Sequence, residues 1–98
     1  MFGLSENTIE AIRGALSACP GLEKAVIYGS RAKGTFRPGS DIDLVLYGSI
    51  SDEDLLRLLN RVDELNTPYL FDIVRYQDID NDELRAHIAR VGQRFDTA

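Results

Sequence analysis

The sequence predicts an α/β fold in which a small mixed β-sheet is packed with helices. Three observations predict this fold. Apolar residues recur at helical spacing in three segments, short runs rich in β-forming residues lie between them, and glycine, proline and asparagine separate the segments. The resulting order is helix, strand, loop, strand, helix, strand, helix, which is typical of helices packed against one sheet.

The first half of the chain contributes one helix and one strand. Residues 5–19 are expected to form a helix that begins after Ser5, a residue type that caps helix N-termini. Residues 24–28 form a short apolar run, which predicts a buried strand. Residues 29–40 contain three glycines and a proline, so we expect a loop with one helical turn after Ser30.

The second half alternates strands with helices. Residues 41–47 and 69–76 are expected to be strands, and residues 51–65 a helix that is capped by Ser51 and long enough for a crossover connection. Residues 81–95 are predicted to be the last helix. Its apolar side comprises Leu84, Ile88, Val91 and Phe95.

Length and composition narrow the class of protein. The 98 residues fit a single domain spanning 1–98. The one cysteine, Cys19, leaves no internal disulfide, and neither a secretion signal nor an apolar run long enough for a membrane span is present. We therefore expect a cytoplasmic protein without membrane contact.

The charge balance argues against a broad nucleic-acid interface. Sixteen acidic residues against eleven basic ones give a net charge of −5, whereas proteins that grip nucleic acid neutralise phosphates with lysine and arginine. An acidic chain can still bind a single nucleotide where metal ions and a few basic groups lie at the site.

Three aspartates are the candidate metal ligands. Asp41 and Asp43 lie two apart on a predicted strand, so their side chains leave the same face while Ile42 and Leu44 point the other way. Adjacent carboxylates repel each other unless a cation lies between them, and Mg²⁺ prefers oxygen ligands. Asp72 lies inside an apolar strand, where a buried lone carboxylate would be costly.

These three acids would share one sheet face if the two strands are neighbours. Three acids on one face can hold two metal ions, which can clamp the attacking and leaving oxygens of a phosphoryl or nucleotidyl transfer. Upstream, Gly29-Ser30 forms a turn after a strand, and Arg31 and Lys33 add positive charge. The loop has neither the Walker A nor the Rossmann pattern.

The residues Gly29-Ser30-Arg31-Ala32-Lys33-Gly34, then Ser40 to Leu44, then Asp72, resemble the DNA polymerase β-type nucleotidyltransferase superfamily. More narrowly, the chain resembles the minimal nucleotidyltransferase (MNT) domains of prokaryotes, the MntA-like antitoxins of HEPN/MNT toxin–antitoxin pairs. The resemblance covers nearly the whole chain in element order and length. It implies the polymerase β-like nucleotidyltransferase core, two Mg²⁺ ions and ATP as substrate.

The resemblance also implies roles for single residues. Asp41, Asp43 and Asp72 would be the catalytic metal ligands, and Asp72 would help to deprotonate the incoming hydroxyl. Gly29 and Ser30 would hold the triphosphate, and the basic positions of the signature fall on Arg31 and Lys33. Small members of this family pair with a HEPN-domain toxin, and some transfer AMP to a tyrosine of that toxin.

The residues also allow plainer interpretations. Gly29-Ser30 can be an ordinary turn, Asp72 an acid facing water on an edge strand, and Arg31 and Lys33 solvated loop charges. His87 is expected to be a surface or partly packed histidine.

Together the sequence predicts a Mg²⁺-dependent nucleotidyltransferase that transfers AMP to a partner protein. The alternatives are a non-catalytic MNT module that neutralises a HEPN toxin by binding it, and a small-molecule nucleotidyltransferase.

Overall fold

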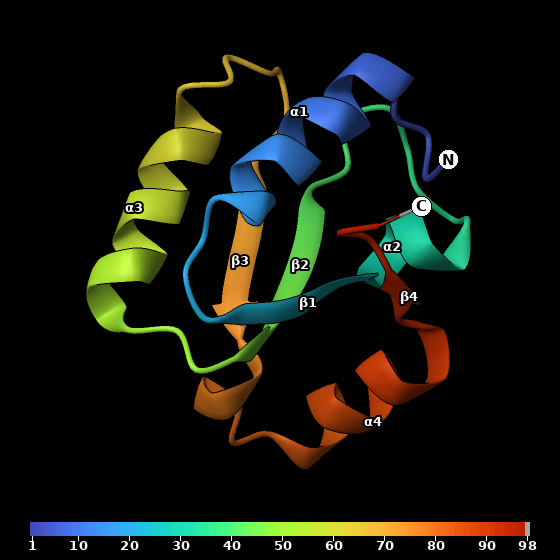
Figure 1. Cartoon of the computed structure of the whole chain (residues 1–98). Helices are drawn as coiled ribbons and strands as arrows, with labels where there is room; N and C mark the ends of the chain where they lie inside the picture. Colours follow the sequence, from blue (N-terminus) through green and yellow to red (C-terminus); the bar gives the residue numbers. More distant parts are fainter. Residues whose placement is uncertain (98) are drawn as a thin grey trace.

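The computed structural model of the chain describes residues 1–97 and contains one four-stranded sheet with helices on both faces (Figure 1). The strand order is β3-β2-β1-β4, so β3 and β4 are the edge strands. The elements in chain order are α1 (Glu6–Ser17), β1 (Leu22–Tyr28), α2 (Gly29–Lys33), β2 (Ile42–Gly48), α3 (Asp52–Asp63), β3 (Phe71–Arg75), the 3₁₀ turn η1 (Tyr76–Asp78), α4 (Asp82–Val91) and β4 (Gln93–Arg94).

The sheet is mixed, as the sequence predicts. β1 and β2 are antiparallel neighbours joined through α2 and the loop that follows it, whereas β2 and β3 are parallel and are joined by the crossover helix α3. β4 pairs antiparallel with β1 at the opposite edge. The predicted fold class, a small mixed sheet packed with helices, is therefore confirmed.

Side-chain caps explain where the three longer helices begin. The hydroxyl of Ser5 accepts the backbone N–H of Thr8, and the hydroxyl of Ser51 accepts that of Asp54, as their positions in the sequence predict. Asn81 caps α4 in the same way by accepting from the backbone of Leu84. None of the helices within residues 1–97 has the length and apolarity needed to cross a bilayer.

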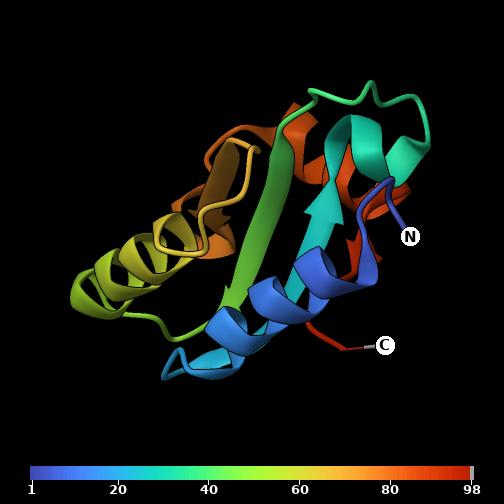
Figure 2. The same ribbon diagram turned by 90° about the horizontal axis from the view of Figure 1, so that it is seen from above.

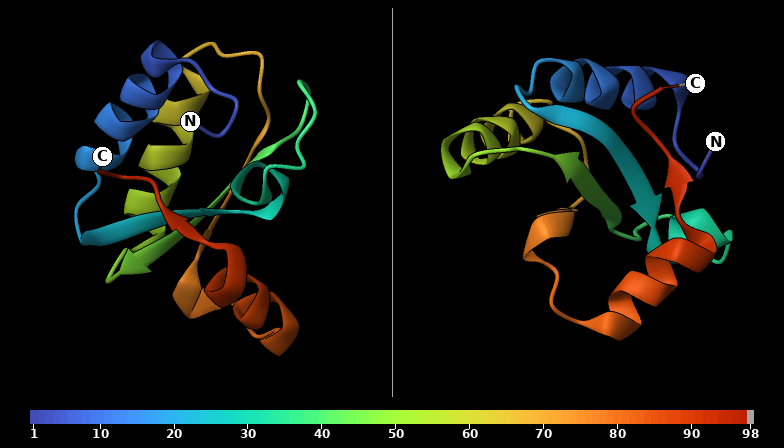
Figure 3. Two further views of the ribbon diagram at one scale, coloured as in Figure 1. Left: turned by 90° about the vertical axis from the view of Figure 1, so that its right-hand side faces the viewer. Right: turned by 60° about the horizontal axis from the view of Figure 1, so that its bottom comes forward.

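Two apolar layers cover the two faces of the sheet, and the views in Figures 2 and 3 show α1 and α3 on one side and α4 on the other. Because side chains alternate along a strand, Ile27, Ile42 and Leu44 face the first layer and are fully buried. Val26, Tyr28 and Val45 face the second layer. The first cluster contains residues of α1, α3 and the strands, and the second adds Ile79, Ile88 and their neighbours.

The last predicted helix is too long. The sequence pattern assigns helix to residues 81–95, but α4 ends at Val91 and the chain turns at Gly92 into β4. Phe95 therefore lies in the first apolar layer, with α1 and α3, and is fully buried. Its ring centroid is 5.9 Å from that of Phe2, and its N–H donates to the carbonyl oxygen of Ala25. Pairing with β1 overrides the helical spacing of the apolar residues.

Smaller boundary differences affect the site. β2 begins at Ile42, so Asp41 lies just before the strand and not on it, and β3 is shorter than the predicted 69–76. The predicted helical turn is present, but it begins at Gly29, immediately after β1. The site residues thus lie where strands meet loops at one end of the sheet.

Candidate active site

Three polar side chains form a row across the sheet. In the β1–β2 pairing Tyr28 lies opposite Asp43, and in the β2–β3 pairing Asp43 lies opposite Asp72. Residues that are paired across neighbouring strands project from the same face. The expected arrangement of Asp43 and Asp72 on one face is therefore present, at the edge of the layer that contains α4.

The electrostatics of this row are dominated by unbalanced negative charge. Burial, together with the charges of Asp72 and Asp41, raises the pKa of Asp43 to about 6. Burial, together with the charges of Asp72 and Asp43, raises the pKa of Tyr28 to about 12. Ionisation of Asp43 therefore costs free energy in the folded chain, and a nearby cation would reduce that cost.

The other two acids are more open than the sequence pattern implies. Asp72 is exposed, so the predicted cost of burying it within an apolar strand does not arise. Asp41 is also exposed and precedes β2, although its charge still affects the pKa of Asp43. Within residues 1–97 no three acidic, histidine or cysteine side chains are grouped closely enough to hold a metal ion without adjustment.

The turn between β1 and α2 requires a glycine for two reasons. Gly29 has φ +74, in the left-handed region that side chains rarely adopt. A β-carbon at this position would also collide with the carboxylate oxygen Oδ2 of Asp43. The backbone of the turn thus lies directly against Asp43, and any side chain at position 29 would displace the carboxylate.

A histidine of α4 fixes the same turn. The backbone N–H of Gly29 donates to Nε2 of His87 at 3.3 Å, so the ring accepts this bond in its neutral form with the proton on Nδ1. The ring also meets Tyr28 edge to face, with centroids 6.1 Å apart. The hydroxyl of Ser30, the first residue after Gly29, has no hydrogen-bond partner within residues 1–97.

The two basic residues of α2 differ sharply. Arg31 is buried, and its guanidinium donates to the carbonyl oxygens of Ser40, Pro38 and Phe2 at 2.9–3.3 Å. It also lies over the ring of Tyr69, 4.9 Å from the centroid. Arg31 is therefore not a solvated loop charge, because backbone carbonyl oxygens surround its guanidinium. Lys33 is exposed on the same short helix.

Arg31 connects the segments that carry the candidate site. The residue itself follows Ser30, the carbonyl of Ser40 precedes Asp41, and Tyr69 lies three residues before Asp72. Its guanidinium supplies several donors in one plane, which suits a point where carbonyls converge. This interior position could not be read from the sequence, because it depends on where the loop returns.

The donor set fits a divalent cation. Asp43 and Asp72 project from the same face in register, and the raised pKa of Asp43 reflects burial and repulsion from neighbouring acids, both of which a bound cation would offset. Asp41 is the third acid; it is exposed and lies immediately before β2, two residues from Asp43. The residues present thus match Mg²⁺ in chemistry.

Sequence reasoning missed the positions of His87 and Tyr28 in the site. The sequence predicts a surface or partly packed histidine at position 87, and His87 is half-buried, but neither its bond to Gly29 nor the place of Tyr28 beside Asp43 is predicted. No local signal identifies either of them, because the packing of α4 and the register of β1 with β2 place them there.

Solved structures with a similar fold come from toxin–antitoxin complexes. A chain of a toxin–antitoxin complex with AMP-PNP is 20% identical, with a TM-score of 0.69 over 94% of this chain and 73% of that one. A chain of a variant MntA–HpeT complex is 18% identical, with a TM-score of 0.68 over the same shares. A chain from the tri-AMPylated HEPN toxin of Shewanella oneidensis in complex with its MNT antitoxin is 16% identical, with a TM-score of 0.66 over 94% and 71%.

At sequence identities of 16–20%, the similarity to these structures shows a shared fold and nothing more. Among curated proteins, no significant match in sequence is found. The sequence profile of the family described as polymerase beta, nucleotidyltransferase matches residues 10–95, which span every strand and the whole row of site residues. The chain that places Gly29 against Asp43, and Asp43 beside Asp72, is therefore a member of the polymerase beta nucleotidyltransferase family.

Proposed function

We propose that the protein is a Mg²⁺-dependent nucleotidyltransferase that uses ATP and transfers AMP to a hydroxyl of a partner protein. The observation that carries the proposal is the placement of Asp43 beside Asp72 on one sheet face, with the Gly29 turn against Asp43, in a chain of this family. This arrangement brings paired carboxylates together with a turn that has a free hydroxyl.

Asp41, Asp43 and Asp72 would hold the metal ions, which when bound neutralise the triphosphate and stabilise the charge that develops during transfer. The hydroxyl oxygen of the acceptor attacks the α-phosphorus of ATP, and the new oxygen–phosphorus bond replaces the bond to the leaving pyrophosphate. Asp72 is exposed and takes the hydroxyl proton. Ser30 and Lys33 contact the phosphates, while His87 keeps the Gly29 turn in place.

The proposed partner is a HEPN-domain toxin, which the chain would counteract as an antitoxin in the cytoplasm. Support comes from two of the similar structures, one of which contains an AMPylated HEPN toxin and the other AMP-PNP.

Titration calorimetry and mass measurement test this proposal together. Wild type should bind ATP in the presence of Mg²⁺, and Asp43→Asn should weaken that binding at least about tenfold. Co-expression with the product of the neighbouring gene should add AMP to that protein in the wild type and not in the variant. Equal ATP binding by both proteins contradicts the metal site, and an unmodified partner contradicts transfer.

A non-catalytic module that neutralises a toxin by binding is the second candidate. The position of Asp41 favours it, since this acid is exposed and lies outside β2. This candidate predicts a stable complex whose partner gains no mass in the presence of ATP and Mg²⁺. The third candidate, a small-molecule nucleotidyltransferase, predicts turnover of ATP without any protein partner.

A further inference from the structure

One edge of the sheet has no neighbour within residues 1–97. β3 is the last strand in the order, and its partner β2 lies on one side only. The N–H of Ile42 donates to the carbonyl of Leu70, and backbone groups alternate in direction along a strand. The backbone groups of Phe71, Ile73 and Arg75 are therefore directed away from β2, where another strand could pair with them.

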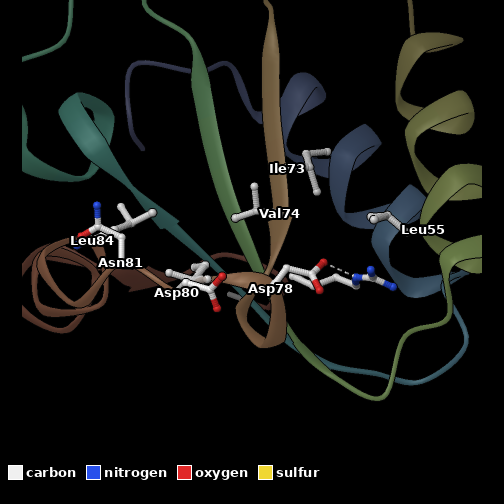
Figure 4. A pocket seen from close by; sticks show the side chains of 9 residues that line it. Leu55, Ile73, Val74, Asp78, Asp80, Asn81 and Leu84 are labelled. Atoms are coloured by element: carbon white, nitrogen blue, oxygen red, sulfur yellow. Dashed lines mark hydrogen bonds and ion pairs between the residues drawn. The ribbon is translucent and has the colours of Figure 1, made fainter.

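Two hollows flank this edge and meet at Ile73. One, of about 340 Å³, lies between the C-terminal part of α3 and the start of β3, where Leu59 and Leu70 line it. The other, of about 430 Å³, lies between α3, the end of β3 and the start of α4, and Figure 4 shows Leu55, Val74 and Leu84 around it. Both hollows are lined by Ile73, and the two together are here called the β3 groove.

Two leucines of the β3 groove are open to solvent. Leu70 is 73% exposed and Leu59 is 37% exposed, whereas Ile73 between the two hollows is buried. α3 lies on the β3 side of the sheet in Figures 1 and 2, and its residue Leu59 remains partly uncovered. An unpaired strand edge beside open leucines is the surface to which an extended peptide adds as a further strand.

The charges of the residues that line the groove indicate which sign of charge its occupant carries. Asp63, Asp78 and Asp80 line the two hollows, and Arg75 is the one basic residue among the described lining residues. Arg75 is already paired with Asp78 and Asp52, at 2.7 Å in each case. The groove is therefore acidic, which disfavours nucleic acid and also a second copy of this chain with its own net charge of −5.

We propose that the β3 groove binds an extended, basic segment of a protein partner as an added strand. Alternate apolar side chains of the segment pack against Leu59 and Leu70 on one face and against Val74 and Leu84 on the other. Its lysine or arginine residues face Asp63 and Asp80. The backbone groups of Ile73 and its neighbours supply the hydrogen bonds.

The same strand carries Asp72 of the candidate active site, between Phe71 and Ile73. A residue paired beside Asp72 in the added strand would project from the same face, with its β-carbon about 5 Å from that of Asp72. A hydroxyl residue at this position is the acceptor for the AMP group, a consequence that rests on the proposed function. Docking itself requires neither ATP nor a metal ion.

Selection from a display library of random peptides on the full chain, without ATP or Mg²⁺, tests the docking. Peptides enriched on the wild type and lost on Leu59→Glu should be basic and should alternate apolar with polar residues. Leu56→Glu is the matched control, because Leu56 is 58% exposed on the same helix and lines neither hollow.

Fluorescence anisotropy on one enriched peptide then measures the contacts. Leu59→Glu should weaken binding about tenfold or more, and Leu56→Glu less than about twofold. Methylating alternate backbone nitrogens of the peptide should weaken binding about tenfold, since it removes the strand hydrogen bonds while keeping the side chains. Thermal unfolding of both variants confirms that each is folded.

Several outcomes overturn the docking. One is enrichment of acidic peptides on the wild type. Another is enrichment on the wild type that does not exceed enrichment on Leu59→Glu, and a third is peptide binding that backbone methylation does not weaken. A wild-type dimer in sedimentation that Leu59→Glu dissociates assigns the groove to a second copy and also overturns it. Incubating a bound hydroxyl peptide with ATP and Mg²⁺ separates the two proposals, because unmodified but bound peptide contradicts only the transfer.

Discussion

At the scale of single residues, the centre of the site is a contact between a backbone and a carboxylate. Gly29 adopts φ +74 and leaves no room for a β-carbon beside Asp43. Gly34 has a similar φ of +81, but a β-carbon there would meet nothing within 4 Å. Substitutions at Gly29 and at Gly34 can therefore be compared to separate the effect of backbone strain from the effect of displacing Asp43.

Gly29→Ala is expected to lower ATP binding in the presence of Mg²⁺ at least about tenfold, because Asp43 must move. Gly34→Ala is expected to cost only the strain of a left-handed side chain, about 1 kcal/mol, with ATP binding unchanged. Calorimetric titration and thermal unfolding of both variants measure the two effects. Equal losses of ATP binding would assign the effect to backbone strain alone.

The two basic residues of α2 should separate stability from binding. Arg31→Met leaves three carbonyls without their donor and is expected to lower the free energy of unfolding by about 3 kcal/mol. Lys33→Met should change stability by no more than about 0.5 kcal/mol, since Lys33 is exposed. It should raise the KM for ATP. Denaturant unfolding and transfer kinetics measure these effects, and an unchanged stability of Arg31→Met would contradict the interior role.

At the scale of elements, the parallel pairing of β2 and β3 creates the site. α3 returns the chain to the same end of the sheet, so β3 starts beside the start of β2 and Asp72 falls opposite Asp43. A shift of one residue would turn Asp72 to the opposite face, among the buried residues Ile42 and Leu44. The register is fixed by those apolar neighbours on one face and by Val45 on the other.

The short strand β4 should contribute strongly to stability through the residue that follows it. Phe95→Ala is expected to lower the free energy of unfolding by about 3–5 kcal/mol, since Phe95 is fully buried among residues of the α1 layer. Leu70→Ala, at an exposed leucine, should cost less than about 0.5 kcal/mol. Chemical denaturation compares them, and a small loss for Phe95→Ala would contradict the position of the chain after α4.

At the scale of the whole molecule, ionisation of Asp43 should make stability depend on pH. Its pKa is raised from 3.8 to about 6 on folding, so the folded chain holds this proton more tightly than the unfolded chain. The resulting stabilisation is complete below about pH 3.8 and is lost as the pH rises through about 6.

Without metal ions, Asp43→Asn should therefore be more stable than wild type at neutral pH and should lose this advantage near pH 4. The expected gap is about 1 kcal/mol, because Asp43 is half-buried and solvent screens its charge. Thermal unfolding of both proteins across this range measures the gap. A gap that does not change with pH would contradict the raised pKa.

Much of the fold follows from local sequence signals. Ser5 and Ser51 mark helix starts, alternation and β-forming residues mark the strands, and the spacing from Gly29-Ser30 to Asp41 and Asp43 marks the candidate site. These features succeed because capping and side-chain periodicity involve residues only a few positions apart. The helix predicted through Phe95 is wrong because pairing of β4 with β1 involves partners almost seventy residues apart, as between Val26 and Arg94.

By itself, the sequence determined the α/β class, the order of the elements as far as α4 and the residues from which a nucleotidyl-transfer site could be built. The tertiary structure alone decided that Asp72 lies opposite Asp43, that Arg31 lies inside the loop and that His87 reaches Gly29. The physical reason is that the sequence specifies the chemistry of each side chain, whereas the distances between side chains far apart in sequence depend on strand register and helix packing. Both are set by the burial of apolar faces across the whole chain.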